Sequence, residues 1–253
     1  MKITFLGTGT SQGVPPIGCK SPVCLSENVK DKRLRASIHV EWNDVSIVID
    51  SGPDFRYQMI RAGIHKLDAL LFTHEHKDHT AGLDDVRPYN YLQDQYIQAY
   101  CSQHVLEALK NQYDYVFSEH KYPGVPLIDF TVIDNSQFTI KDLPILPIQV
   151  MHYKLPVFGY RFDKFAYITD ANFISDLELE KLKGLEVLVL NALRREPHMS
   201  HFTLTEATNL ALKIGAKQTF FTHMSHQIGF HDDVCNELPN GIDLAYDGLQ
   251  VIL

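Results

Sequence analysis

The most constraining stretch of the chain is an apolar segment that runs directly into a group of histidines and carboxylates. Residues 68–73 are short, largely apolar and free of Pro and Gly, which predicts a buried β-strand. The pattern His-x-His-x-Asp-His follows at once, with His74, His76, Asp78 and His79. Zn, Mn and Fe accept imidazole and carboxylate ligands. Four such donors within six residues are too dense for an ordinary solvated loop, so the pattern predicts a metal site.

Three further residues of ligand type follow predicted strands elsewhere in the chain. These are His152, Asp170 and His223. Each alone would be read as a hydrogen-bonded turn residue, but α/β sheets assemble their sites at the carboxyl ends of strands. Seven donors exceed the needs of one tetrahedral ion, so together they predict two metals, with Asp170 as the bridging carboxylate. Two ions about 3.5–4 Å apart can share a hydroxide and clamp a phosphoryl centre, which suits hydrolysis.

The rest of the chain predicts alternating strands and helices in one domain spanning residues 1–253. Strands are expected at residues 2–6, 37–42, 45–50, 96–101, 130–133, 137–140, 145–150, 157–162, 165–169, 186–190 and 218–222. Helices are expected at residues 55–62, 103–111, 176–183 and 204–214. A further helical segment after Thr80 is expected to be interrupted near Pro88, and residues 14–35 are expected to be irregular.

Charge and hydropathy narrow the classes of partner. Asp and Glu outnumber Lys and Arg by 31 to 23, a formal net charge of −8, so binding to a large nucleic acid is not expected. The first residues lack the apolar run of a signal peptide, and no run approaches a membrane span, which predicts a cytoplasmic protein without a membrane partner. The four cysteines then argue against a disulfide framework. A homodimer is compatible with this composition.

The ligand pattern resembles the signature of the metallo-β-lactamase superfamily, in which His-x-His-x-Asp-His is followed by distant His, Asp and His. The resemblance covers nearly the whole chain. It implies an αββα sandwich, with two mixed sheets face to face, helices on the outer faces and the metals at one edge. Carried over by motif, it assigns the first ion to His74, His76, His152 and Asp170, and the second ion to Asp78, His79, Asp170 and His223.

Within the superfamily, the chain is most similar to the phosphoribosyl 1,2-cyclic phosphate phosphodiesterase (PhnP) family. The stretches that carry this likeness are residues 6–9 with 12–15, Gly18-Cys19 with Cys24, residues 222–227, and Leu238-Pro239 with Asp247-Gly248. The likeness implies a dinuclear metal-dependent phosphodiesterase that hydrolyses a small, cyclic phosphate diester. A hydroxide bridging two divalent ions, either Mn or Zn, would attack phosphorus.

The same likeness implies roles for residues around the metals. His201 matches the position of a histidine that protonates the leaving alkoxide, and Asp78 would also orient the hydroxide. On spacing alone, His198 is a rival to His201, and either histidine can equally be an ordinary surface residue. Arg87 is a candidate phosphate contact. The basic run Lys30–Arg35 is a second candidate, although a solvated charge run is the commoner explanation.

A structural zinc site is also implied. In the resembling phosphodiesterases, three cysteines spaced Cys-x-Cys-x-x-Cys and a distant histidine hold one zinc ion. Here Cys19 and Cys24 match two of the cysteines and His226 matches the histidine, but Ser21 stands where the middle cysteine should be. A serine hydroxyl is a poor zinc donor. The remaining position would be filled by water, by His231 or by Cys235, or the ion would be absent.

Four other functions compete with phosphodiester hydrolysis. A thioester or lactam hydrolase like glyoxalase II would use the same metal centre on a carbonyl group. A nuclease like the tRNA 3′-processing endonuclease would need a basic protruding arm, which the sequence lacks. A di-iron redox protein of this superfamily would carry a carboxylate at the place of His76. A non-catalytic scaffold would be expected to have lost ligands, whereas all seven stand here.

Overall fold

The first of two β-sheets in the computed structural model, which describes residues 1–120 and 122–253, is built on a buried hairpin. β2 (Ser37–Trp42) and β3 (Val45–Ile49) pair antiparallel, and Asn43 adopts a positive φ of 51° in the turn, as the sequence predicts. The remaining strands are β1 (Lys2–Gly7), β4 (Ala69–Leu71), β5 (Ile97–Cys101), β6 (Ile128–Val132) and β15 (Gln250–Ile252). Their order is β15-β1-β2-β3-β4-β5-β6.

The second sheet combines an antiparallel half with a parallel half. The strands are β7 (Phe138–Ile140), β8 (Leu143–His152), β9 (Leu155–Phe162), β10 (Phe165–Ile168), β11 (Phe173–Ile174), β12 (Val187–Asn191), β13 (Gln218–Thr222) and β14 (Ile242–Leu244). Their order is β11-β8-β9-β10-β12-β13-β14, with β7 paired to β8. β10, β12, β13 and β14 run parallel, so their carboxyl ends meet at one edge.

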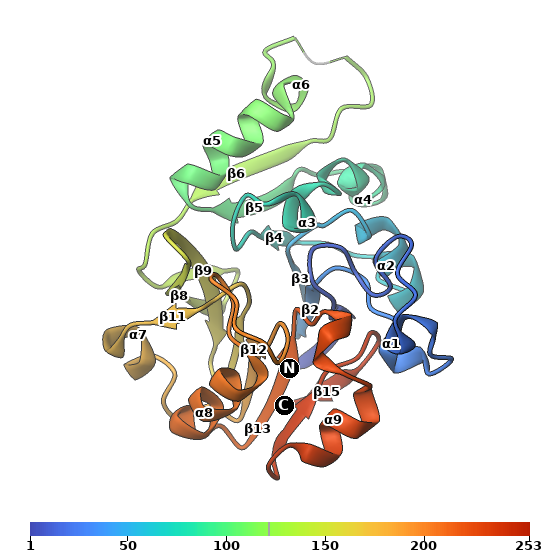
Figure 1. The fold of residues 1–253 in the computed structure, drawn as a ribbon. Helices are drawn as coiled ribbons and strands as arrows, with labels where there is room; N and C mark the ends of the chain where they lie inside the picture. Colours follow the sequence, from blue (N-terminus) through green and yellow to red (C-terminus); the bar gives the residue numbers. More distant parts are fainter. Residues whose placement is uncertain (121) are drawn as a thin grey trace.

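Three apolar layers hold the molecule together. Between the sheets, Phe5 and Ile47 pack with Tyr160 and Phe165, all fully buried. The outer face of the first sheet is covered by α2 (Phe55–Ala62), α4 (Arg87–Gln93) and α5 (Gln103–Gln112). The outer face of the second sheet is covered by α7 (Asp176–Glu180), α8 (Leu204–Ile214) and α9 (His231–Glu237). The order of layers is therefore the expected αββα sandwich (Figure 1).

Helix boundaries follow local signals. α2 ends at Gly63, which takes the left-handed conformation with a φ of 63°, and α8 begins at a capping box in which Thr203 and Glu206 bond to each other's main-chain N–H. Both helices were predicted. The expected interruption near Pro88 is confirmed: the 3₁₀ turn Leu83–Val86 ends and α4 begins one residue before this proline, which lies in the first turn of α4, where a missing N–H costs no hydrogen bond.

Several short elements were not predicted. Residues 14–35, expected to be irregular, contain α1 (Pro22–Leu25) and the 3₁₀ turn Val29–Asp31. The other short elements are α6 (Asp114–Phe117), β11, α9, β14 and β15. Each is seven residues or fewer, too short for periodicity to distinguish it from a loop. Among the described residues, no helix combines the length and the apolar character that crossing a membrane requires.

Two glycines allow the loops at one edge to pack in contact. A Cβ atom on Gly52 would lie 2.0 Å from the Asp78 carbonyl oxygen, and one on Gly82 would lie 2.1 Å from the Gly52 carbonyl oxygen. Any larger residue would push these main chains apart. The loop after β3 is therefore fixed against the segment that carries the histidine motif.

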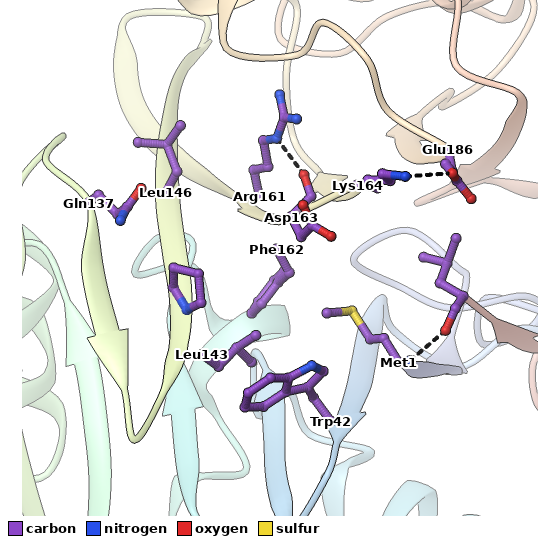
Figure 2. Close-up of a pocket in the computed structure, with 12 residues that line it drawn as sticks. Met1, Trp42, Gln137, Leu143, Leu146, Arg161, Phe162, Asp163, Lys164 and Glu186 are labelled. Carbon is purple, nitrogen blue, oxygen red and sulfur yellow. Dashed lines mark hydrogen bonds and ion pairs between the residues drawn. The ribbon is translucent and has the colours of Figure 1, made fainter.

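A cavity of about 680 Å³ lies at the opposite edge of the sandwich (Figure 2). Leu143, at the start of β8, lines it, whereas His152 ends the same strand about 30 Å away at ~3.3 Å per residue. Its charged side chains pair locally, as Lys164 does with Glu186 at 3.1 Å. None of the described residues that line this cavity is a histidine or a cysteine, so the cavity offers no imidazole or thiolate ligands for a metal.

Candidate metal centre

Four of the predicted ligands form one group at the edge where the strands end. His74 follows β4 by three residues, His152 is the last residue of β8, and Asp170 follows β10 by two residues. Together with His76, they offer ligand atoms that all lie within 4.8 Å of one another. Strands from both sheets therefore contribute to this group.

A second group shares Asp170 with the first. It contains Asp78, His79 and His223, again with all ligand atoms within 4.8 Å of one another. Asp78 and His79 lie in the short helix α3 (Lys77–Thr80), and His223 directly follows β13. His223 Nε2 lies 3.0 Å from Asp170 Oδ1, and His79 Nε2 lies 3.1 Å from Asp78 Oδ2. All seven predicted ligands thus converge.

Hydrogen bonds to one ring nitrogen orient three of the histidines. His79 Nδ1 donates to Asp50 Oδ2 at 2.7 Å, and His152 Nδ1 donates to the Ser200 carbonyl oxygen at 2.9 Å. His74 Nδ1 lies 2.9 Å from the Thr73 hydroxyl. That hydroxyl donates its own proton to Asp50, so it accepts from His74. In each case Nε2 is left facing the cluster, as metal-binding histidines require.

In the described chain, two buried histidine nitrogens of the cluster are not satisfied by hydrogen bonds. His79 Nε2 and His223 Nε2 are buried, and neither has a hydrogen-bond partner among the described residues. Buried nitrogen atoms without partners are costly. Both atoms face the Asp170 carboxylate. The donor set and these two atoms fit divalent cations, so the His/Asp groups can hold metal.

The electrostatics of the cluster also call for cations. Burial alone would lower the pKa of His79, yet the carboxylates of Asp78, Asp170 and Asp50 raise it well above its ordinary value. Burial likewise opposes, but Asp170 raises, the pKa of His223 to about 9. Conversely, His223 and His79 hold the pKa of Asp170 well below its usual range although burial favours the neutral acid. Divalent ions would supply the positive charge that protonated imidazoles supply otherwise.

His201 lies against both groups of ligands. Its ring centroid is 4.6 Å from that of His152 and 4.9 Å from that of His223. Its Nδ1 is buried and has no hydrogen-bond partner in the part of the chain that the structure describes, and burial lowers its pKa to about 3, so the ring is neutral near pH 7. His198 is more exposed, and its ring centroid lies 5.0 Å from that of His201 with the two rings tilted by 34°. Position therefore favours His201 over His198 as the group nearest the reacting atoms.

The chain has clear relatives. A family model described as a beta-lactamase superfamily domain matches residues 46–224. The crystal structure of a new diphosphatase from the PhnP family is 38% identical, with a TM-score of 0.94 over 100% of this chain and 97% of that one. The chain belongs to the PhnP family. It has the metallo-β-lactamase fold of metal-dependent hydrolases, as its sequence signature predicts.

Two further proteins are similar to this PhnP-family chain, one in its fold and one in its sequence. Zn²⁺-bound PqqB from Methylobacterium extorquens is 17% identical and superposes with a TM-score of 0.83 over 100% of both chains, which shows a shared fold. A protein of Porphyromonas gingivalis (strain ATCC BAA-308 / W83) named octanoyltransferase is 39% identical over 256 residues. The match covers 100% of this chain and 52% of that protein, so the chain spans about half the length of this relative.

Asp50 is a functional residue of this PhnP-family chain that sequence reasoning missed. It is fully buried directly after β3 with a φ of 65°, and it accepts hydrogen bonds from the Thr73 N–H, the Thr73 hydroxyl and His79. The available signal was a carboxylate at the carboxyl end of a buried strand, beside the strand that leads into the motif. Asp50 acts on the metal centre only by orienting His79, and no ligand motif marks such a residue.

The predicted phosphate contacts, Arg87 and the basic run Lys30–Arg35, are engaged with other groups of the chain. Arg87 donates to the carbonyl oxygens of Asp84 at 3.1 Å and Gly124 at 3.3 Å, and neither partner belongs to the metal groups. In the basic run, Arg33 is only 4% exposed and Arg35 forms an ion pair with a nearby carboxylate. The Arg87 guanidinium is thus engaged with main-chain oxygens and its contact with phosphate stays a prediction, whereas the basic run is not simply solvated as the commoner explanation held.

The remaining predicted site is also assembled. Cys19, Cys24 and His226 offer ligand atoms within 4.8 Å of one another. Ser21 is present at the cluster, where its Oγ lies 3.4 Å from Cys19 Sγ. The suggested substitutes are not part of this group, because Cys235 Sγ lies 3.7 Å from the His231 ring and that ring contacts a buried arginine. The cluster thus has three protein donors.

Proposed function

We propose that the chain is a phosphodiesterase that hydrolyses small phosphate diesters, including cyclic ones, with two divalent ions at the metal centre. The observation that carries this proposal is the position of His201 against two ligand groups that share Asp170. A proton donor at the rim of a two-ion site suits a reaction with an oxygen leaving group. The 38% identity to a PhnP-family diphosphatase supports chemistry at phosphorus.

The first role of the side chains at this centre is to bind the two ions. Two divalent ions, when bound, acidify water and offset the charge that builds on phosphorus. Asp170 belongs to both donor groups and would hold both ions, while His74, His76 and His152 would complete one ligand set. Imidazole and carboxylate donors do not discriminate between Mn and Zn, so either ion serves.

Asp78 and His79 have linked roles. Asp50 fixes the tautomer and direction of the His79 ring through the 2.7 Å bond at Nδ1. Asp78 Oδ2 lies within 3.5 Å of both His79 Nε2 and His223 Nε2, so it is at the centre of the second ligand set. Besides binding metal, Asp78 accepts a hydrogen bond from the attacking water and so orients that water.

His201 donates a proton to the leaving oxygen. The ring is neutral in the free protein, so one ring nitrogen carries hydrogen and can donate to an oxygen of the bound substrate. An anionic phosphate next to the ring favours its charged form and opposes the effect of burial. The hydrogen on the ring is therefore held more firmly when the substrate is bound, and it is delivered to the leaving oxygen as the ester bond breaks.

A diphosphate diester is the second candidate substrate. The specific observation is the PhnP-family neighbour, which is described as a diphosphatase and matches this chain over its full length. Attack at phosphorus with the same ligands would break a P–O–P bond instead of a P–O–C bond. The leaving phosphate is more acidic than an alkoxide, so this reaction would depend less on His201.

We also propose a structural zinc at Cys19, Cys24 and His226. His226 Nδ1 is buried without a hydrogen-bond partner among the described residues, as expected of a nitrogen that faces a metal. Zinc favours two thiolates and one imidazole, with water in the fourth place. The substrate remains the main partner proposed; absence of a membrane or large nucleic-acid partner, a homodimer and a cytoplasmic location stay predictions.

A substrate panel tests the proposal. Mn-loaded and Zn-loaded protein is given a 1,2-cyclic ribose phosphate, 2′,3′-cyclic AMP, a dinucleotide diphosphate and an S-acyl glutathione. Hydrolysis of the cyclic phosphates that is lost in His201→Ala and kept in His198→Ala supports phosphodiester hydrolysis. Cleavage of the diphosphate alone, with weak dependence on His201, would support the second candidate. Hydrolysis of the thioester alone would overturn both.

A further inference from the structure

The cluster of Cys19, Cys24 and His226 offers three protein donors, and the neighbouring Ser21 hydroxyl is already engaged in other hydrogen bonds. Ser21 Oγ accepts the main-chain N–H of Cys24 at 3.3 Å and so caps the start of α1. The same oxygen lies 3.4 Å from Cys19 Sγ. A neutral hydroxyl that is engaged in this way is a poor zinc ligand. Zinc held by three protein donors is bound less firmly than in a four-donor site, so its two thiolates are released more readily.

The two thiols are placed for reaction with each other. Their sulfur atoms lie within 4.8 Å, and neither is in a disulfide. Cys24 is 4% exposed, whereas Cys19 is half-buried and precedes α1 on a loop. One accessible thiol and one buried thiol a few residues apart form a pair in which the first can react with an oxidant from solvent and the second can resolve the product.

We propose that Cys19 and Cys24 form a redox-active pair that either binds zinc together with His226 or closes into a disulfide. The two states exclude each other, because a disulfide sulfur is no longer a thiolate ligand. This proposal adds a modification site to the chain and does not depend on which phosphate ester the metal centre hydrolyses.

The chemistry balances with a small disulfide as oxidant. The Cys19 thiolate attacks one sulfur of glutathione disulfide and releases one glutathione, which leaves a mixed disulfide at Cys19. The Cys24 thiolate then attacks Cys19 Sγ and releases the second glutathione. Two electrons pass from the cysteines to glutathione, the zinc ion leaves as Zn²⁺, and each departing glutathione takes up a proton from solvent. A dithiol reductant reverses the reaction.

The two states tie different parts of the chain together. Zinc would join α1 to His226, 202 positions beyond Cys24, whereas the disulfide closes only the loop from residue 19 to residue 24. Cross-links that close long loops restrict the unfolded chain more than those that close short loops. Oxidation therefore removes a long-range connection. His226 lies three residues after the metal-centre residue His223, so this connection ends next to the proposed active site.

The test compares wild-type protein with Ser21→Cys. Both are reduced, loaded with zinc, freed of excess metal and treated with glutathione disulfide. Released zinc is followed with a chromogenic chelator, and disulfides are located by peptide mapping. Wild type is expected to release one zinc as a Cys19–Cys24 disulfide forms, and dithiothreitol should reverse both changes. Ser21→Cys, which restores a third thiolate, is expected to keep its zinc at least about tenfold longer.

Three results would overturn the proposal. They are failure of the reduced wild type to hold zinc at this cluster, absence of a Cys19–Cys24 disulfide after oxidation, and equal rates of zinc loss in the two proteins. Cys24→Ser identifies the zinc that belongs to the cluster, since this variant should hold one ion fewer. Cys101 is an internal control: it is fully buried and burial raises its pKa to about 12, so it should stay reduced.

Discussion

The two metal-ligand clusters of this chain differ in how strongly the fold determines them. At the edge of the sandwich, seven donors converge from both sheets, and hydrogen bonds hold three of the histidine rings in position. The cluster at Cys19, Cys24 and His226 joins α1 and the loop before it to the 3₁₀ turn His226–Ile228, and Ser21 stands in place of a fourth donor. The first cluster has enough protein donors to hold metal, whereas the donor set of the second depends on a single side chain.

Removal of the shared carboxylate should have the largest effect. Asp170→Asn keeps the size of the side chain but removes the charge that both ligand groups use. Hydrolysis is expected to fall to the uncatalysed background, and metal analysis should show that ions are lost from the edge cluster. The matched control is Asp163→Asn, in the turn between β9 and β10 at the opposite edge, which should retain both. Full metal content in Asp170→Asn would contradict the sharing.

Removal of His201 should have the next largest effect. His201→Ala is expected to lower kcat for a cyclic phosphate by about 10²–10⁴-fold, the range for loss of a general acid. The metal content should not change, because His201 belongs to neither ligand group. His198→Ala is the control and should lower kcat far less. If the two variants have equal kcat values, the position of His201 against the ligand rings has no catalytic meaning.

The support given to His79 can be tested separately. Asp50→Asn removes the charge, and its amide cannot accept from all three donors, because the Thr73 N–H bonds to Oδ1 while the Thr73 hydroxyl and His79 Nδ1 both bond to Oδ2; metal affinity or activity should therefore fall by ~10–100-fold. Asp54→Asn changes a carboxylate of the same loop that pairs with Arg35 instead, and it should keep the metal. Both affinities can be measured by isothermal titration with Mn²⁺. Equal affinities would show that the edge cluster needs no such support.

The smallest effect on activity is expected at the second cluster. Ser21→Cys should bind zinc more tightly there and raise the midpoint of thermal unfolding in zinc, while kcat stays unchanged. Ser26→Cys places a thiol at the other end of α1 and should do neither. Differential scanning calorimetry and competition with a chelator provide the two measurements. A large change in kcat in Ser21→Cys would show that the clusters are not independent.

The sequence predicted the edge cluster because its signals are local. The dense motif follows an apolar strand, and single ligands lie at the ends of three other strands. These residues come together if the four strands end at the same edge of the sandwich. Asp50 escaped prediction because its role is to orient His79, and a contact between two side chains leaves no pattern in either stretch of sequence. Arg87 was predicted from its closeness in sequence to the motif, which says nothing about where a helix directs its side chains, and its guanidinium donates to two main-chain oxygens.

Short elements mark the same limit in the fold. α2 and α8 were predicted because Gly63 and the Thr203 capping box define their ends. α9 carries no capping side chain, and β15 pairs with β1 from the far end of the chain. Elements that are stabilised by tertiary contacts have no local signature to read.

Titration of metal-free protein with Mn²⁺, with hydrolysis of 2′,3′-cyclic AMP as the readout, tests the central claim most directly. Two ions that share Asp170 predict activity that rises to a plateau at two equivalents of metal per chain, since Mn²⁺ has little affinity for the cysteine cluster. A plateau at one equivalent, or metal binding without any hydrolysis of a phosphate ester, would contradict a two-ion phosphodiesterase.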